Sequence, residues 1–220
     1  MHEGRMASDK AEFWERRHEI SPSVGEESET EDYQLALLAD ITDAELYSVG
    51  EELSEKLDRF GCFSTSPPEA YHLTVKLFDV AVSPSVADTD DPPPSVRRVE
   101  TAVSRVLAAY QPFDIQFPQL NLFPDVVYAE VADRGRLAGI NKDLCQEDKI
   151  AVFDRDYDAF IPHLTLGYFQ NDIGYELFVE FLENNRTICF PPFTIETLSL
   201  VAYDIGGHPP TYKRIERYEI

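Results

Sequence analysis

An eight-residue phrase occurs twice in this chain. The first copy, "YHLTVKLF", spans residues 71–78, and the second, "PHLTLGYF", spans residues 162–169. A shift of 91 residues superimposes His72 on His163, together with the threonine two residues later. Because the chain has only five histidines, two of them in near-copies of one phrase indicate a duplicated folding unit. Such a duplication restricts the chain to folds built from two related halves.

The flanking sequence extends the repeat. The same shift aligns the apolar positions of two predicted helices, and further on a shift of 80 aligns "PFDI" at residues 112–115 with "PFTI" at residues 192–195. The two shifts differ by about the length of the acidic, proline-rich segment "SPSVADTDDPPPS", which begins at Ser83. We therefore predict a duplicated strand–helix–strand–helix–strand unit with one insertion in its first copy.

Hydrophobic periodicity locates the elements of this unit. Apolar runs of strand length predict strands, and apolar residues at three- and four-residue spacing predict helices. In the first predicted helix, Thr42 and Glu45 form a capping box and Gly61 marks the end. Strands are expected at residues 33–40, 71–80, 112–120, 125–131, 162–169, 192–203 and 211–220, and helices at residues 41–61, 95–110, 132–145 and 174–185.

The chain is strongly acidic. Its net charge is −22, from 41 acidic and 19 basic side chains, and only six of the basic ones are lysines. This balance indicates a surface adapted for solubility, as in a halophilic proteome that lives in molar salt. It excludes a broad basic face for nucleic acid, so RNA would have to be bound through a few local contacts in a cleft. In molar salt the Debye length is about 3 Å, and only such short-range contacts remain effective.

Other bulk features narrow the class of protein. Cys62, Cys145 and Cys189 are far apart and odd in number, so neither a disulfide framework nor a zinc site is indicated. No apolar run has the length of a membrane span, and the N-terminus lacks the apolar core of a signal peptide. We expect a cytoplasmic monomer without membrane contact.

Composition also suggests where the folded domain begins. Residues 1–32 are polar and acidic and are predicted to form a flexible tail, with a docked helix at "FWERRHEI" as the alternative. A single bilobal domain is predicted to span residues 33–220, with halves at about 33–120 and 121–220.

The polar face of each repeated strand carries the candidate site. Successive side chains of a strand alternate between the two faces of its sheet. The residues predicted to share the polar face are His72, Thr74 and Lys76 in the first copy and His163, Thr165 and Gly167 in the second. The opposite face, which includes Tyr168, is predicted to belong to the core. In a pseudo-symmetric fold, the two polar faces look at each other across a cleft.

Two opposed imidazoles can divide the acid and base roles of phosphoryl chemistry. One accepts a proton from the attacking water or hydroxyl, and the other donates a proton to the leaving oxygen; a pKa near ~6.5 suits both roles. Threonine hydroxyls can donate to the nonbridging phosphate oxygens, and Lys76 can add a positive charge there. This chemistry needs no metal ion or other cofactor.

Structural explanations compete with this interpretation. A single H-x-T is more often structural, since threonine suits strands and a lone strand histidine is usually structural or exposed. Two copies in matching repeats favour function. Lys76 by itself carries less weight, because a strand lysine is usually solvated or protects a sheet edge. Asp154, Asp156 and Asp158 alternate like calcium ligands but lack the glycine and glutamate of a calcium loop, so we exclude that site.

The chain resembles the 2H phosphoesterase superfamily, in particular the branch named for 2′–5′ RNA ligase and RNA 2′,3′-cyclic phosphodiesterase. The matching phrases are "YHLTVKLF", "PFDIQFPQLNLFPDVVYAEV", "FIPHLTLGYF" and "FTIETLSLVAYD", which cover most of residues 33–220. The resemblance implies an α+β fold with two pseudo-symmetric lobes and antiparallel sheets around a central cleft. It also implies opening of a cyclic phosphodiester, on an RNA end or a small nucleotide, to a phosphomonoester.

The resemblance assigns roles to the repeated motifs. His72 and His163 are the implied catalytic pair, and Thr74 and Thr165 the implied phosphate-binding residues. His163 is favoured as the group that activates water and His72 as the group that protonates the leaving oxygen, although pseudo-symmetry permits the reverse.

The two copies differ beyond the threonine. RNA-processing members of the family often carry a basic residue shortly after each H-x-T; Lys76 fits this pattern, whereas the second copy has Gly167 and Tyr168. We expect substrate choice to be decided at this difference. The alternatives are 2′–5′ RNA ligation or cleavage of 2′–5′ linkages, and a non-catalytic nucleotide- or RNA-binding protein that keeps the cleft.

Overall fold

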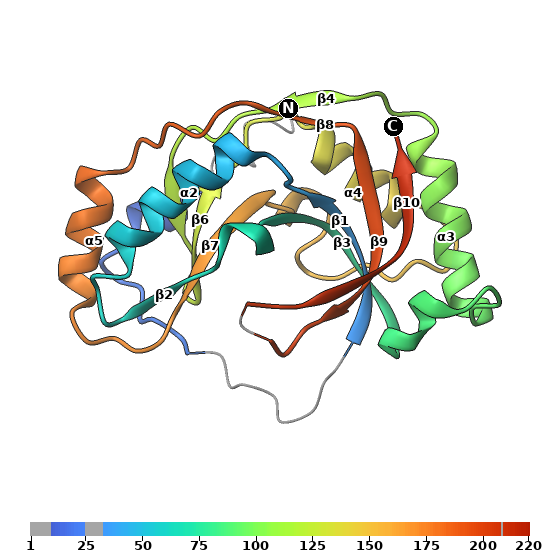
Figure 1. Ribbon diagram of the computed structural model, residues 1–220, viewed down its shortest axis with the longest axis horizontal. Helices are drawn as coiled ribbons and strands as arrows, with labels where there is room; N and C mark the ends of the chain where they lie inside the picture. The colour runs from blue at the N-terminus through green and yellow to red at the C-terminus, as the bar shows by residue number, and fades with distance from the viewer. Residues whose placement is uncertain (1–9, 25–32, 208) are drawn as a thin grey trace.

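The chain combines strands with α-helices and short 3₁₀ helices (Figure 1). The computed structural model describes residues 10–24, 33–207 and 209–220. The strands are β1 (Tyr33–Asp40), β2 (Phe63–Thr65), β3 (His72–Val82), β4 (Phe113–Ile115), β5 (Leu120–Leu122), β6 (Val126–Glu130), β7 (His163–Phe169), β8 (Phe193–Ile195), β9 (Thr197–Asp204) and β10 (Tyr212–Glu219). The α-helices are α2 (Ala44–Leu57), α3 (Pro94–Leu107), α4 (Arg136–Cys145) and α5 (Tyr175–Asn184), and the 3₁₀ helices are η1 (Pro68–Ala70), η2 (Pro84–Asp88) and η3 (Tyr157–Ala159).

Antiparallel pairing joins the strands throughout the part of the chain that is described. One four-stranded sheet has the order β10-β9-β1-β3, a second has the order β2-β7-β6-β5, and β4 pairs with β8. Every pairing between these strands is antiparallel. The predicted α+β class with antiparallel sheets is therefore confirmed.

Helices pack against both sheets and enclose the core. α3 contacts β10 and α4 contacts β3 in the first sheet, whereas α2 contacts β2 in the second. From α5, the ring of Phe178 packs against Phe63 and Phe169 of the second sheet, with centroids 5.0 and 5.6 Å apart. The apolar faces predicted from helical periodicity are the buried ones, and together they form one continuous core.

The first helix begins and ends differently from its predicted signals. Asp43 is the N-cap, and its carboxylate accepts a hydrogen bond from the amide of Leu46 at 2.8 Å. Aspartate caps a helix at least as well as threonine, so Asp43 displaces Thr42 from this role. The helix ends at Leu57, before Gly61 is reached.

The two sheets do not follow the two halves of the sequence. β9 and β10, from the second half, complete the sheet that contains β1 and β3, while β2, from the first half, pairs with β7. Spatial lobes therefore cannot be drawn as residues 33–120 and 121–220. The second half contributes two strands to the sheet of β1 and β3, and the first half contributes β2 to the sheet of β7, which ties the halves into one folded unit.

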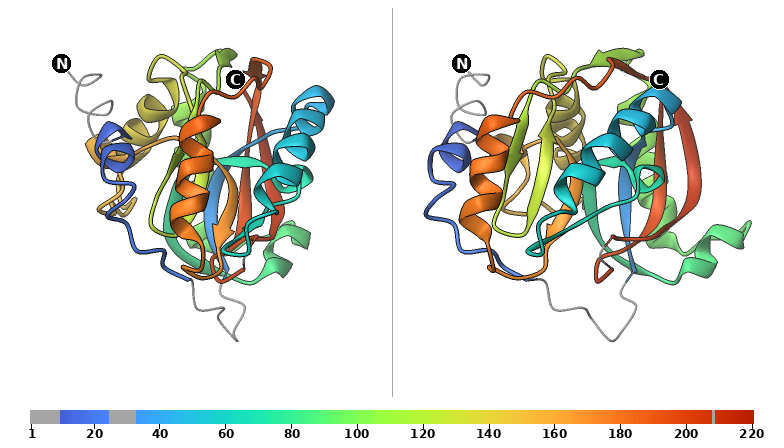
Figure 2. Two further views of the ribbon diagram at one scale, coloured as in Figure 1. Left: turned by 90° about the vertical axis from the view of Figure 1, so that its left-hand side faces the viewer. Right: turned by 60° about the vertical axis from the view of Figure 1, so that its left-hand side comes forward.

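Residues 10–24, here called the N-terminal segment, pack against the domain and run along α5 (Figure 2). Residues 10–15 are helical, and Trp14 and Ile20 pack against the core. The prediction of a flexible tail is therefore wrong for this segment, because its few apolar side chains outweigh its acidic composition. The remainder of the predicted tail, residues 1–9 and 25–32, lies outside the described residues.

Candidate active site

Both H-x-T motifs line one cavity. β3 and β7, which carry the motifs, contact each other although they belong to different sheets. The cavity has a volume of about 760 Å³, and its walls include His72, Thr74, His163 and Thr165. A space of this size suits a nucleotide-sized ligand.

Each histidine of the pair is oriented by the backbone carbonyl two residues before it. Nδ1 of His72 donates to the carbonyl of Ala70 at 2.8 Å, and Nδ1 of His163 donates to the carbonyl of Ile161 at 2.7 Å. A carbonyl can only accept, so the proton of each neutral ring lies on Nδ1 and leaves Nε2 as the basic nitrogen. The two motifs therefore share a tautomer as well as a sequence.

Tyr203, on β9, is a cavity residue that was not predicted from the sequence. Its hydroxyl lies 3.3 Å from Nε2 of His72 and also hydrogen-bonds with Thr74. Its ring packs edge to face against His72, with centroids 5.5 Å apart. Among the described residues, Nε2 of His163 has no comparable partner. A tyrosine 131 residues from His72 leaves no signal in the local pattern of the motif.

Burial lowers the pKa of both histidines below the usual value of 6.5. Asp40 of β1 lies opposite His72 in the β1–β3 pairing, and its negative charge opposes this effect by raising the pKa of His72. Around His163, positive charge on His72 and Lys10 lowers the pKa further, while Asp125 raises it. The nearby cations thus favour a neutral His163, and the nearby anion favours a protonated His72.

A β-bulge after the first motif changes which residues face the cavity. In the pairing of β1 with β3, Leu38 lies opposite Thr74 but Leu37 lies opposite Lys76, so β3 contains one extra residue at this point. Lys76 therefore shares the core face with Leu37. The prediction that His72, Thr74 and Lys76 lie on one face is wrong for Lys76, because the bulge shifts the alternation by one residue.

The second motif is followed by the same irregularity. In β7 the register shifts between Thr165 and Gly167, which puts Gly167 on the core face and leaves Tyr168 lining the cavity. Both placements are the reverse of those predicted. A Cβ on Gly167 would lie 2.3 Å from the carbonyl oxygen of Ser64 in β2, so this position has no room for a basic side chain.

Lys76 borders the cavity, but its charge is buried and paired. Its Nζ donates to Oδ2 of Asp156 at 2.6 Å, and the two side chains are 0% and 3% exposed. Asn141 and the amide of Phe153 also donate to Asp156. Burial by itself raises the pKa of Asp156, but these hydrogen bonds and the Lys76 charge outweigh it and hold the pKa below its usual value. The pair ties β3 to the loop between α4 and η3, and Lys76 is not available to a phosphate in this arrangement.

Arg155, on the same loop, is a second cavity residue that was not predicted. It is exposed, it lines the cavity, and its guanidinium carbon lies 5.8 Å from the ring centroid of Phe153. Its neighbour Asp156 is anchored to Lys76, which fixes the backbone that presents Arg155. Within the described residues no carboxylate forms an ion pair with Arg155. A basic residue inside "FDRDYDAF" was its only signal in the sequence.

Outside the cavity, the described residues offer neither a metal site nor a disulfide. In residues 10–24, 33–207 and 209–220, no group of His, Cys, Asp or Glu side chains is arranged to hold a metal ion. Cys62, Cys145 and Cys189 are free thiols. The described helices include none long and apolar enough to cross a bilayer.

Comparison with known proteins identifies relatives of this chain. Residues 51–207 match the family model described as the 2′-5′ RNA ligase superfamily. The RNA 2′,3′-cyclic phosphodiesterase of Methanothermobacter thermautotrophicus is 24% identical over 161 residues, which cover 70% of this chain and 80% of that relative.

Solved structures share the fold. TT0787 of Thermus thermophilus matches with a TM-score of 0.60 at 16% identity, over 84% of this chain and 97% of that one. Escherichia coli LigT complexed with 3′-AMP matches with a TM-score of 0.60 at 14% identity, over 86% of this chain and 99% of that one. At these identities the likeness concerns the fold alone, and it agrees with the duplicated, pseudo-symmetric arrangement.

Proposed function

This chain belongs to the 2′-5′ RNA ligase superfamily of 2H phosphoesterases, and from this premise we propose that it opens a 2′,3′-cyclic phosphodiester to a phosphomonoester by two-histidine acid–base catalysis. The observation that carries the proposal is a single cavity lined by two imidazoles of the same tautomer, His72 and His163. The relative named RNA 2′,3′-cyclic phosphodiesterase supports the same reaction.

In the proposed reaction, the two histidines act on opposite sides of the phosphorus. Nε2 of His163 takes a proton from the attacking water as the new P–O bond forms. Nε2–H of His72 donates its proton to the ribose oxygen as the P–O bond to that oxygen breaks. The products are a ribose hydroxyl and a phosphomonoester, and proton exchange with solvent then restores both rings. The surrounding charges support this assignment, since they favour a neutral His163 and a protonated His72.

The phosphate is held by hydroxyl donors and one cation. Thr74 and Thr165 donate to the nonbridging oxygens, where negative charge develops. Arg155 takes the role first expected for Lys76, since its guanidinium is exposed at the cavity and offers several donors to one phosphate. Tyr203 holds the position of His72 and of Thr74.

The substrate is an RNA end or a small cyclic nucleotide. The cavity volume of about 760 Å³ fits a ligand of this size. LigT, which shares the fold, was solved with 3′-AMP, and this supports a nucleotide as the ligand here. A net charge of −22 argues against binding of a long RNA tract.

The test measures turnover of nucleoside 2′,3′-cyclic phosphates, and of RNA that ends in a cyclic phosphate, in molar KCl. His72→Ala and His163→Ala are each expected to lower kcat by about 10²–10⁴-fold, the contribution of one general acid or base. Thr74→Val and Thr165→Val are expected to lower turnover as well. Thr101→Val, on the exposed face of α3, is the matched control and leaves turnover unchanged.

Other outcomes separate the alternatives. If the wild-type protein turns over neither the cyclic phosphates nor a 2′–5′-linked substrate, the enzyme proposal is wrong and the non-catalytic nucleotide-binding protein remains. Turnover that survives both histidine substitutions contradicts the site. Activity restricted to 2′–5′-linked substrates identifies the ligase or 2′–5′ phosphodiesterase alternative. EDTA is expected to leave the rate unchanged.

A further inference from the structure

The active-site cavity includes one side chain from the N-terminal segment, Phe13. The family model covers residues 51–207, so the segment lies outside the part of the chain that the family describes. TT0787 and LigT are covered over 97% and 99% of their lengths, while they cover only 84% and 86% of this chain. This chain is therefore longer than the shared fold, and Phe13 adds to a cavity that the family model does not fully describe.

Hydrogen bonds connect the N-terminal segment to both ends of the β5–β6 hairpin. Near its start, Nζ of Lys10 donates to the carbonyl of Val131 at 3.0 Å, and the amide of Asn121 donates to the carbonyl of Lys10 at 2.9 Å. Near its end, the amide of Ser23 donates to the carbonyl of Pro124 at 2.8 Å. The segment thus has a defined path beside the second sheet.

Contacts with α5 and the chain after it fix the middle of the segment. Nε of Arg17 donates to Glu183 at 2.6 Å. The ring of Trp14 lies beneath the guanidinium of Arg186, 3.9 Å from its carbon. These contacts are made within the protein, so a ligand that contacts Phe13 does not have to order the segment.

Phe13 stands at the end of a row of rings that leads to His163. Its centroid lies 4.8 Å from that of Phe123 at an interplanar angle of 80°, and Phe123 lies 5.2 Å from His163 at 89°. Phe13 is half-buried and lines the cavity. When a nucleotide binds with its phosphate beside His163, its base can therefore reach the ring of Phe13.

We propose that Phe13 is a stacking platform for a nucleobase of the substrate. The inference rests on the proposed phosphoesterase function and adds the residue that contacts the base of the substrate. A phenyl ring has no hydrogen-bonding group, so it accepts any base, and a purine covers more of the ring than a pyrimidine. Stacking also persists in molar salt, where contacts between basic side chains and phosphates weaken.

The test compares kcat/KM for adenosine 2′,3′-cyclic phosphate with kcat/KM for 1-O-methylribose 2′,3′-cyclic phosphate, which has no base. Phe13→Leu keeps an apolar side chain but removes the ring. It is expected to lower kcat/KM for the nucleotide about tenfold and to leave the base-free substrate unchanged. Trp14, the one tryptophan of the chain, reports by its fluorescence that the segment stays docked in the variant.

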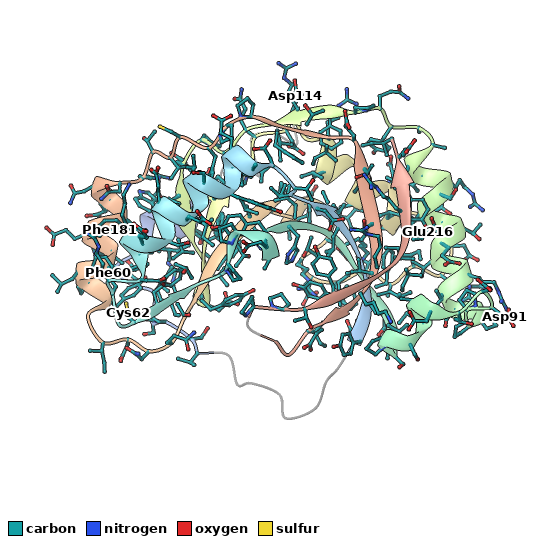
Figure 3. All side chains as sticks on the ribbon, viewed as in Figure 1. Phe60, Cys62, Asp91, Asp114, Phe181 and Glu216 are labelled. Atoms are coloured by element: carbon teal, nitrogen blue, oxygen red, sulfur yellow. The ribbon has the colours of Figure 1, made fainter. Side chains whose placement is uncertain are left out.

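Phe181→Leu is the matched control. Phe181 is a half-buried phenylalanine on α5, and its ring packs against that of Phe60 with centroids 5.2 Å apart (Figure 3). It is not part of the cavity wall. This variant is expected to leave the discrimination between the two substrates unchanged. Equal losses for both substrates in Phe13→Leu, or no loss for either, would overturn the stacking role.

Calorimetric binding separates this inference from the proposed function. If the wild-type protein binds adenosine 3′-phosphate more tightly than inorganic phosphate, and Phe13→Leu abolishes the difference, the stacking site stands even where no substrate is turned over. If cyclic phosphates are turned over but Phe13→Leu shows no base-specific loss, the function stands and the stacking site is wrong.

Discussion

The two histidines of the cavity are equivalent in sequence but not in surroundings. His72 lies beside Asp40 and contacts the hydroxyl of Tyr203, whereas His163 responds to Lys10 and to His72 itself. Burial lowers the pKa of both below 6.5. The pair with one proton, the form that the proposed reaction needs, is therefore most populated below pH 6.5.

This leads to a prediction about pH dependence. We expect kcat/KM for a cyclic nucleotide to be bell-shaped with its optimum below pH 6.5, because the rate falls as His72 loses its proton and also as His163 gains one. Asp40→Asn removes a charge that raises the pKa of His72, so the basic limb should move to lower pH. Asp125→Asn removes a charge that raises the pKa of His163, so the acidic limb should move to lower pH.

The measurement is a kcat/KM profile from acidic to alkaline pH for the wild type and both variants. If Asp40→Asn shifted the acidic limb and Asp125→Asn the basic limb, His163 would be the acid and His72 the base. A rate that stays constant from pH 6.5 upward would show that His72 does not act as a protonated acid.

The difference between Lys76 and Gly167 has a packing explanation. Both residues lie on core faces, where Lys76 meets Asp156 and Gly167 meets the backbone of Ser64. The expectation that substrate choice is decided at these two positions therefore lacks a structural basis. Cavity side chains outside the two motifs, Arg155 among them, are better placed to decide it.

At the scale of elements, β3 and β7 carry bulges at matching positions. Each bulge falls between the threonine of H-x-T and the residue two places later. An added residue turns the following side chains over, so Leu77 and Tyr168 line the cavity. The repeat thus preserves an irregularity of the strand as well as its sequence, and this irregularity shapes the wall next to each phosphate-binding threonine.

The buried Lys76–Asp156 pair links two elements of the site, and its removal has a predictable cost. Lys76→Met leaves Asp156 buried without its counter-charge, so the free energy of unfolding is expected to fall by about 3–5 kcal/mol. Replacing both partners, with Asp156→Leu added, should recover part of this loss. Because the loop that presents Arg155 is loosened, KM should rise more than kcat falls.

Urea unfolding followed by circular dichroism measures the first effect, and steady-state kinetics the second. Lys142→Met, at an exposed position of α4, is the control and should change stability by no more than about 0.5 kcal/mol. If Lys76→Met kept its stability but lost phosphate binding, Lys76 would be a substrate ligand, as first predicted.

At the scale of the whole molecule, charge sets the conditions in which the fold is stable. A net charge of −22 on 220 residues produces repulsion that compact folding must overcome. Salt shortens the range of this repulsion, from about 10 Å at 0.1 M to about 3 Å at 1 M. Halophilic adaptation stays a prediction, and it implies that the fold is most stable where the repulsion is screened.

We expect the melting temperature to rise when KCl is increased from low to molar concentration. Sorbitol at equal osmolality serves as the control, because a neutral solute does not screen charge. A melting temperature that falls in KCl, or that rises equally in sorbitol, would contradict a stabilisation by screening. Scanning calorimetry provides the measurement.

The fold class, the positions of the helices and the paired motifs could be predicted from the sequence alone. Apolar periodicity located the helices and the long strands, and the 91-residue repeat joined His72 to His163 as one candidate site. These features are local or repeated, so they can be read from neighbouring residues without knowledge of the folded chain. The family resemblance depended on the same phrases and is confirmed by the family match.

The other residues that enter the cavity could not be predicted from the sequence, because folding brings them from distant parts of the chain. Tyr203 arrives from β9, Arg155 from a loop held by a buried ion pair, and Phe13 from a segment docked on α5. The bulges that turn Lys76 and Gly167 toward the core depend on pairing with β1 and β6. Strand register and docking are set by contacts between residues far apart in the chain, and a one-residue shift reverses every face that strict alternation predicts.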